Sequence, residues 1–232
     1  MEHGPFTWFS LIPGLRNLPP HTAGSIVVAL FLIVSSLLAF RRLRSVEEAI
    51  IPSDRLSITN LLELIVETTL SLLNDIIGHE GKRYLPLIGS LAFYILFSNL
   101  LGLIPGFTPP TGNLSTNFAC ALVVFFFYHY YGFRSNGIGY IKHFLGPLLP
   151  LAVIMFPVEL ISNLARPITL TVRLFANMTA DHMVLEQALK VFLVIPVLAM
   201  MLGLFVCVVQ TLIFCLLSTI YIALAVEETE HH

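Results

Sequence analysis

The order of apolar and polar residues divides the chain into long hydrophobic runs separated by short polar segments. No Asp, Glu, Lys or Arg occurs in residues 21–40, 84–133 or 191–226. A run of about 20 apolar residues crosses the hydrocarbon core of a membrane as one helix. The pattern predicts three ordinary spans and two longer apolar helices, at residues 22–40, 85–104, 116–131, 144–180 and 191–226.

Residues 55–78 show a different pattern, with apolar residues at helical spacing and polar residues on the opposite face. Leu62 and Ile65 lie on one side, whereas Glu63 and Glu67 lie on the other. A helix of this kind lies along an interface rather than across a bilayer. Because its polar face is acidic and anionic headgroups repel it, we expect this amphipathic interfacial helix to contact another protein.

The last apolar run is too long for an upright span. Residues 191–226 are 36 uncharged residues, and a helix of this length extends over roughly 54 Å at ~1.5 Å per residue. An upright crossing needs only ~20 residues. The sequence therefore predicts a helix that tilts steeply, kinks at Pro196 or follows a curved partner.

Composition supports a membrane protein and excludes several classes. The 232 residues are 56% hydrophobic and 11% charged, whereas soluble domains carry about 25% charged residues. A soluble enzyme and a disordered scaffold are therefore excluded, and a net charge of −2 gives no sign of nucleic-acid binding. We expect an all-α integral membrane protein, with residues 1–232 forming a single membrane domain.

The basic residues predict an orientation. Lys and Arg number six in residues 41–84, two in 132–143 and none in 105–115. Because basic loops stay in the cytoplasm, the N-terminus is expected outside and the C-terminus inside. All three cysteines lie in apolar runs, where we expect small hydrophobic side chains and no metal site or disulfide.

A polar stripe marks the helix at residues 144–180. Glu159, Arg166 and Arg173 are spaced by seven residues and fall within about 40° of one helix face. An arginine at bilayer depth costs ~2.5–3.5 kcal/mol and cannot deprotonate. For Arg166 an ion pair with a carboxylate, or snorkelling beside Pro167, is sufficient. For Arg173 the sequence favours a functional role.

The usual motifs of soluble enzymes are absent from the sequence. It contains no nucleotide-binding loop, zinc-protease motif or nucleophile elbow, so we expect no cofactor and no ATP chemistry on this chain. His182 beside Asp181 suits either a proton relay or a hydrogen bond at a helix end. A stand-alone transporter would show two repeated halves in its sequence, and no such repeat is found. An intramembrane enzyme would need a histidine at a suitable spacing from Ser162 or Ser218, and no such histidine is found.

The stripe lies within a longer motif. Residues 159–178, ELISNLARPITLTVRLFANM, resemble the signature of subunit a of the F-type ATP synthase, its membrane stator. Residues 97–106 (FSNLLGLIPG), 210–214 (QTLIF) and 221–228 (YIALAVEE) resemble other parts of that family in the same order.

This resemblance implies a fold and a mechanism. The family has about five membrane-embedded helices and one amphipathic surface helix, and the last two helices are long and tilt steeply against a ring of c subunits. Arg173 matches the essential arginine that faces the ring's carboxylates, and Gln210 matches a residue near it. Asn177, Glu159 and Asn99 match polar positions of two aqueous half-channels. The implied partners are the c-ring, the peripheral-stalk b subunits, the rest of the complex and the lipid bilayer.

One position departs from the family pattern. Members often pair a carboxylate at the position of His182 with a histidine on the last helix, or the reverse, but here His182 faces Gly203. Asp181 or Glu186 is then expected to serve in the channel. Protons are the default ion, while sodium and the number of c subunits stay open. The short chain without a transit peptide favours a bacterial inner membrane.

Overall fold

The fold consists of long helices. The computed structural model describes Trp8 and residues 18–43, 58–137, 139–140, 152–190 and 194–227. Its α-helices are α1 (Pro20–Leu43), α3 (Ile58–Ile77), α4 (Leu85–Gly102), α5 (Leu114–Asn136), α7 (Ala152–Ala188) and α8 (Val194–Glu227), with short 3-10 helices η2 (His79–Tyr84) and η3 (Pro110–Gly112). The prediction of an all-α membrane protein is confirmed, since three segments, at residues 20–38, 80–102 and 194–226, are long and apolar enough to cross a membrane.

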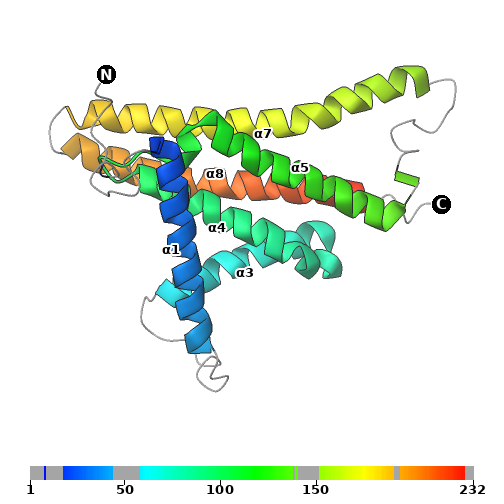
Figure 1. The fold of residues 1–232 in the computed structure, drawn as a ribbon, viewed down its shortest axis with the longest axis horizontal. Helices are drawn as coiled ribbons and strands as arrows, with labels where there is room; N and C mark the ends of the chain where they lie inside the picture. Colours follow the sequence, from blue (N-terminus) through cyan, green and yellow to red (C-terminus); the bar gives the residue numbers. More distant parts are fainter. Residues whose placement is uncertain are drawn as a thin grey trace.

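The two longest helices form one side of the molecule. Helices α7 and α8 run in opposite directions, α5 packs against both, and α4 packs against α8 (Figure 1). Helix α1 contacts α4 and η3 and runs crosswise to α7 and α8, and the amphipathic α3 packs on η2, α4 and α8. If α1 crosses the membrane upright, α7 and α8 must therefore be steeply inclined.

Helix α7 extends beyond the residues expected from the sequence. The expected start at residue 144 lies outside the described residues, and the helix ends at Ala188 rather than near residue 180. Its last turns remain helical because Leu185 and Ala188 are buried, 4% and 6% exposed, and because His182 contacts Glu186 one turn away. Pro157 and Pro167 lie inside α7, where neighbouring helices tolerate them in membrane proteins.

Pro196 does not need to bend the last helix. Helix α8 begins at Val194, so Pro196 lies in its first turn. The backbone N–H groups of a first turn have no intrahelical partner, and proline is tolerated there. The helix then continues to Glu227.

Helix α5 is bounded by a cap at each end. The Asn113 side chain accepts a hydrogen bond from the Ser115 backbone N–H (2.9 Å), which is a standard N-cap. At the other end Gly137 adopts φ +54°, a conformation that side chains disfavour, and its N–H bonds to the Phe133 carbonyl. The helix therefore extends beyond the expected 116–131 at both ends.

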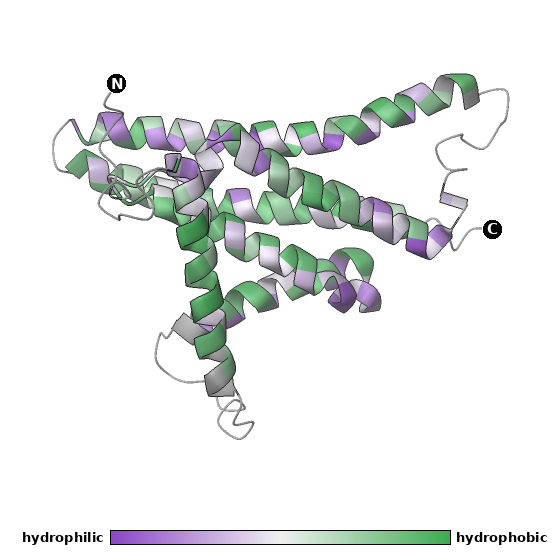
Figure 2. Ribbon diagram, in the orientation of Figure 1, coloured by the Kyte–Doolittle hydropathy of each residue, from purple (hydrophilic) through white to green (hydrophobic). Residues whose placement is uncertain are grey.

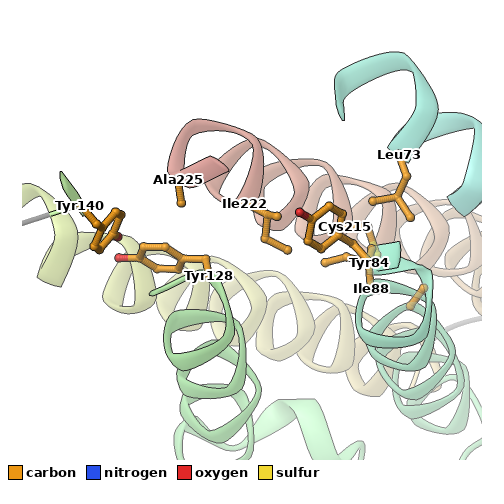
Figure 3. Packing of buried hydrophobic residues seen from close by; sticks show 9 residues of the cluster. Leu73, Tyr84, Ile88, Tyr128, Tyr140, Cys215, Ile222 and Ala225 are labelled. Atoms are coloured by element: carbon orange, nitrogen blue, oxygen red, sulfur yellow. The ribbon is translucent and has the colours of Figure 1, made fainter. Parts of the chain in front are cut away.

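Two apolar clusters hold the helices together. One contains Leu73 of α3, Ile88 of α4, Tyr128 of α5 and Ile222 of α8, all at most 1% exposed (Figure 3). The other joins α4, α5, α7 and α8 around Phe214. The second cluster lies on the inner sides of α7 and α8, and among the described residues the outer sides of these two helices carry exposed apolar side chains.

Candidate functional site

Arg173 lies on α7 at the border between its buried and exposed sides. Its neighbours Leu170 and Leu174 are buried, whereas Ile168 and Val172 are 55% and 51% exposed. Arg173 itself is exposed. No carboxylate of the described residues lies within ion-pair distance of its guanidinium. An arginine at membrane depth needs an anion or water, so this cation must find one outside the described chain.

The surface beside Arg173 is strongly apolar. Large exposed hydrophobic residues line the outer sides of both long helices: Ile161, Leu164, Ile168, Val172 and Met183 on α7, and Leu198, Met201, Leu202, Phe205 and Val208 on α8. Figure 2 shows hydrophilic bands interrupting the hydrophobic length of α7, whereas α1 is hydrophobic along most of its described length. A cation at the edge of an apolar surface fits a partner that is also apolar and carries a carboxylate.

Asn177 and Gln210 meet between α7 and α8, one turn from Arg173. The Asn177 side-chain amide donates to Gln210 Oε1. Gln210 is only 3% exposed, and a buried amide without a partner would destabilise the fold. The structure thus brings together two of the residues that the sequence selected, next to the arginine.

Glu159 lies in a second polar cluster near the start of α7. Asn163 Nδ2 donates to Glu159 Oε1 (2.9 Å), and the Tyr128 hydroxyl of α5 donates to Asn163 Oδ1 (2.8 Å). The Arg166 guanidinium carbon lies 5.7 Å from the Tyr128 ring centre and 5.0 Å from that of Tyr221 on α8. The structure therefore gives Arg166 two aromatic partners, where the sequence suggested a carboxylate.

Asn99 belongs to a third polar group, near the end of α4. The Thr111 hydroxyl donates to Asn99 Oδ1 (2.6 Å), and Asn117 Nδ2 donates to the Thr111 carbonyl (2.7 Å). All three residues are fully buried. Asn99 Nδ2, Asn117 Oδ1 and the nearby Ser98 Oγ have no hydrogen-bond partner in the described chain. Unsatisfied polar atoms at one buried place are typical of a site for ordered water.

Asp181 and His182 continue α7 beyond Arg173. Asp181 Oδ2 and His182 Nδ1 are buried and have no hydrogen-bond partner among the described residues. His182 Nε2 lies 3.4 Å from Glu186 Oε1, and Asp181 is within electrostatic range of Cys207 on α8. Both expected substitutes for the missing partner of His182 thus lie near this part of α7.

The space in front of Gly203 is filled by a packing contact rather than by a polar partner for His182. A Cβ atom at Gly203 would lie 2.6 Å from Leu103 Cδ2, so the side chain of Leu103 fills the space in front of this glycine. Close by in the fold, a Cβ at Gly102 would lie 2.7 Å from Pro109 Cβ and 3.0 Å from Met178 Cε. The segment after α4 is therefore pressed against both α7 and α8.

The polar groups lie on opposite sides of Arg173. Along α7, Glu159 precedes Arg173 by roughly 21 Å and Asp181 follows it by roughly 12 Å, at ~1.5 Å per residue. The Asn99 group lies at the Asp181 end, because η3 packs against α7 and Gly102 touches Met178. Within the described residues no three His, Cys, Asp or Glu side chains are placed to hold a metal.

Sequence reasoning missed several members of these groups. Thr111, Asn117, Asn163 and Tyr128 are buried and hydrogen-bonded to site residues. A polar residue inside an apolar run was a usable signal for Asn117 and Asn163. No signal existed for Tyr128, since a tyrosine near a helix end also suits the membrane boundary.

Comparison with known proteins identifies the family of the chain. The family model described as ATP synthase A chain matches residues 22–223. The chain is 42% identical over 221 residues to ATP synthase subunit a of Sorangium cellulosum, covering 94% of this chain and 86% of that protein. It is 39% identical over 223 residues to the same subunit of Bdellovibrio bacteriovorus, covering 95% and 97%. The chain therefore belongs to the ATP synthase A chain family and is a multi-pass membrane subunit of the F-type ATP synthase.

Proposed function

We propose that this chain translocates protons between the membrane surfaces and a ring of c subunits. Two aqueous half-channels load and unload the ring's carboxylates, and the resulting rotation drives ATP synthesis on other subunits. The observation that carries the proposal is Arg173, an exposed cation at the edge of an apolar surface with no carboxylate of the described chain beside it.

A carboxylate on a partner ring would supply the anion that Arg173 needs at membrane depth. Such a group faces lipid only when neutral, because a bare charge in hydrocarbon is costly. Beside a guanidinium it ionises and releases its proton. Arginine suits this role better than lysine because it stays charged at any working pH. The apolar sides of α7 and α8 would then lie against the equally apolar ring.

The polar groups on either side of Arg173 supply the two half-channels. We assign the inlet to the buried group of Asn99, Asp181 and His182, whose unsatisfied atoms suit water. We assign the outlet to Glu159 at the other end of α7. Arg173 lies between the two and repels protons that would pass directly. Each proton moved through ~100 mV yields ~2.3 kcal/mol, which this separation directs into rotation.

We further propose an orientation and a location. The basic residues that follow the first span belong in the cytoplasm, so the N-terminus lies outside and Glu159 lies on the cytoplasmic side. The chain would lie in a bacterial inner membrane, with the peripheral-stalk b subunits as further partners. The acidic face of α3, with Glu63 and Glu67, is one surface for such a contact.

The experiment is proton pumping by the assembled complex in inverted membrane vesicles. We expect Arg173→Ala to abolish ATP-driven acidification and to raise the passive proton leak, while the complex still assembles. Arg134→Ala is the matched control: it removes an exposed arginine whose hydrogen bond within the described part of the chain is to Tyr130 on its own helix, and pumping should persist. Normal pumping by Arg173→Ala would show that Arg173 is only a structural cation and would overturn the mechanism.

A further inference from the structure

Three side chains form a hydrogen-bonded chain that ends at Glu159. The Tyr128 hydroxyl donates to Asn163 Oδ1 (2.8 Å), and Asn163 Nδ2 donates both to Glu159 Oε1 (2.9 Å) and to the Glu159 carbonyl (3.0 Å). An amide has one acceptor atom and one donor atom. Because the phenol occupies the acceptor, the donor is the atom left for the carboxylate. Tyr128 therefore fixes which way the Asn163 amide points.

This series of hydrogen bonds is rigid because Tyr128 and Asn163 are buried. Tyr128 is 1% exposed and Asn163 is 4% exposed. In Figure 3 the Tyr128 ring leaves α5 and lies among residues of other helices, near Tyr140 and Ile222. Arg166 lies over the same ring and over that of Tyr221, and such cation–π contacts hold a ring in place. A buried hydroxyl held in this way keeps its hydrogen bond to Asn163.

We propose that Tyr128 and Asn163 are positioning residues for proton transfer through Glu159. They hold the carboxylate in one orientation, so that it takes up a proton on one side and gives it up on the other. Glu159 takes up one proton, which makes it a carboxylic acid, and then releases that proton to water. The side chain therefore ends each cycle unchanged. This inference rests on the proposed function.

Other charged or titratable groups surround the three hydrogen-bonded side chains. Arg166 lies on α7 with Glu159, Tyr221 lies on α8, and His129 on α5 has its Nδ1 2.8 Å from the Tyr140 hydroxyl. The Asn163 amide touches the Glu159 carboxylate directly. A change at Tyr128 or Asn163 should therefore alter proton transfer through Glu159.

The test compares hydroxyl removal at two tyrosines of α5. Tyr128→Phe keeps the ring over Arg166 and removes the hydroxyl that donates to Asn163. Tyr131→Phe is the matched control, because its ring contacts Tyr84 (centres 4.7 Å apart) and its hydroxyl has no hydrogen bond to a described residue. Asn163→Leu removes the amide and keeps the branched shape of the side chain. ATP-driven acidification of inverted vesicles is measured over a range of external pH, which is the pH of the cytoplasmic face.

The expected result is a displaced pH profile. Loss of the amide donor removes the hydrogen bond from Asn163 to Glu159 Oε1, so the alkaline limb of the pumping profile, where the rate falls as the pH rises, should move in Asn163→Leu. Tyr128→Phe should move it in the same direction by less, and Tyr131→Phe should leave it in place. A change of structure alone would lower the pumping rate at every pH without moving the limb.

Two outcomes overturn the inference. An unmoved limb in Tyr128→Phe and Asn163→Leu would show that Glu159 does not depend on them. If the Tyr128→Phe protein is no longer found in the membrane, the Tyr128 hydroxyl is needed for folding rather than for proton transfer. If Arg173→Ala still abolishes pumping in the same vesicles, either outcome leaves the proposed function standing. If Arg173→Ala pumps normally, the proposed function fails first.

Discussion

A methyl group added at either of two glycines tests the packing of the segment after α4. At Gly102 the new Cβ would lie 2.7 and 2.9 Å from Pro109 Cβ and Cγ, and 3.0 Å from Met178 Cε. Carbon atoms prefer about 3.5–4.0 Å. At Gly203 the new Cβ would meet only the end of Leu103, at 2.6 Å. The same substitution therefore meets a rigid ring in one place and a flexible side chain in the other.

The expected free energies of unfolding follow from this difference. A proline ring cannot rotate away, so Gly102→Ala should cost ~1–3 kcal/mol from overpacking. At Gly203, a shift of Leu103 off its preferred rotamer costs ~0.5–1.5 kcal/mol. Replacing a glycine inside a helix by alanine returns ~0.5–1 kcal/mol, so Gly203→Ala should be nearly neutral. The net difference of ~1–3 kcal/mol corresponds to roughly 2–12 °C in the unfolding temperature of a chain of this size.

The buried cysteines provide the assay. Cys120, Cys207 and Cys215 are 8%, 1% and 3% exposed and form no disulfide, so they should react with a fluorescent maleimide only when the helices separate. The purified complex is heated with the reagent, and the labelled chain is read on a gel. Gly102→Ala should label at a lower temperature than wild type, and Gly203→Ala at nearly the wild-type temperature. Equal curves for both variants, or an earlier one for Gly203→Ala, would refute the packing argument.

Two further substitutions test the core and a helix cap. Phe214→Ala empties a site that is 1% exposed at the centre of the cluster joining four helices; it should cost ~3–5 kcal/mol and lower the temperature of maleimide labelling, and an unchanged curve would contradict this. Asn113→Ala removes the cap of α5 and should cost ~0.5–2 kcal/mol; hydrogen exchange should quicken in the first turn of α5, whereas unchanged protection there would mean that the cap contributes nothing.

The sequence predicted the helical architecture because long uncharged runs have few alternatives. A run without charges must be a helix in a membrane, where each backbone polar group needs a partner within its own segment. The end of α7 was harder to predict. Asp181, His182 and Glu186 looked like the polar boundary of a span, but Leu185 and Ala188 are buried against neighbours and keep this part helical.

The contacts within the site depend on which helices become neighbours. The stripe of Glu159, Arg166 and Arg173 follows from spacing on one helix, so the sequence contained it. The partners of Arg166 did not follow, because the rings of Tyr128 and Tyr221 come from two other helices. Periodicity describes one helix at a time and carries no information about pairs of helices.

The charges of α7 have a consequence for how this chain enters the membrane during synthesis. Helix α7 is absent from the described segments that are apolar enough to cross a membrane by themselves, whereas α8, which follows it, is included. Glu159, Arg166 and Arg173 alone, at ~2.5–3.5 kcal/mol each, oppose insertion of α7 by roughly 8–10 kcal/mol. The rings of α5 and the amide of Gln210 on α8 are the partners that its polar groups meet. Helix α7 should therefore wait at the membrane surface until α8 has been synthesised, and the two should enter the bilayer together as a helical hairpin.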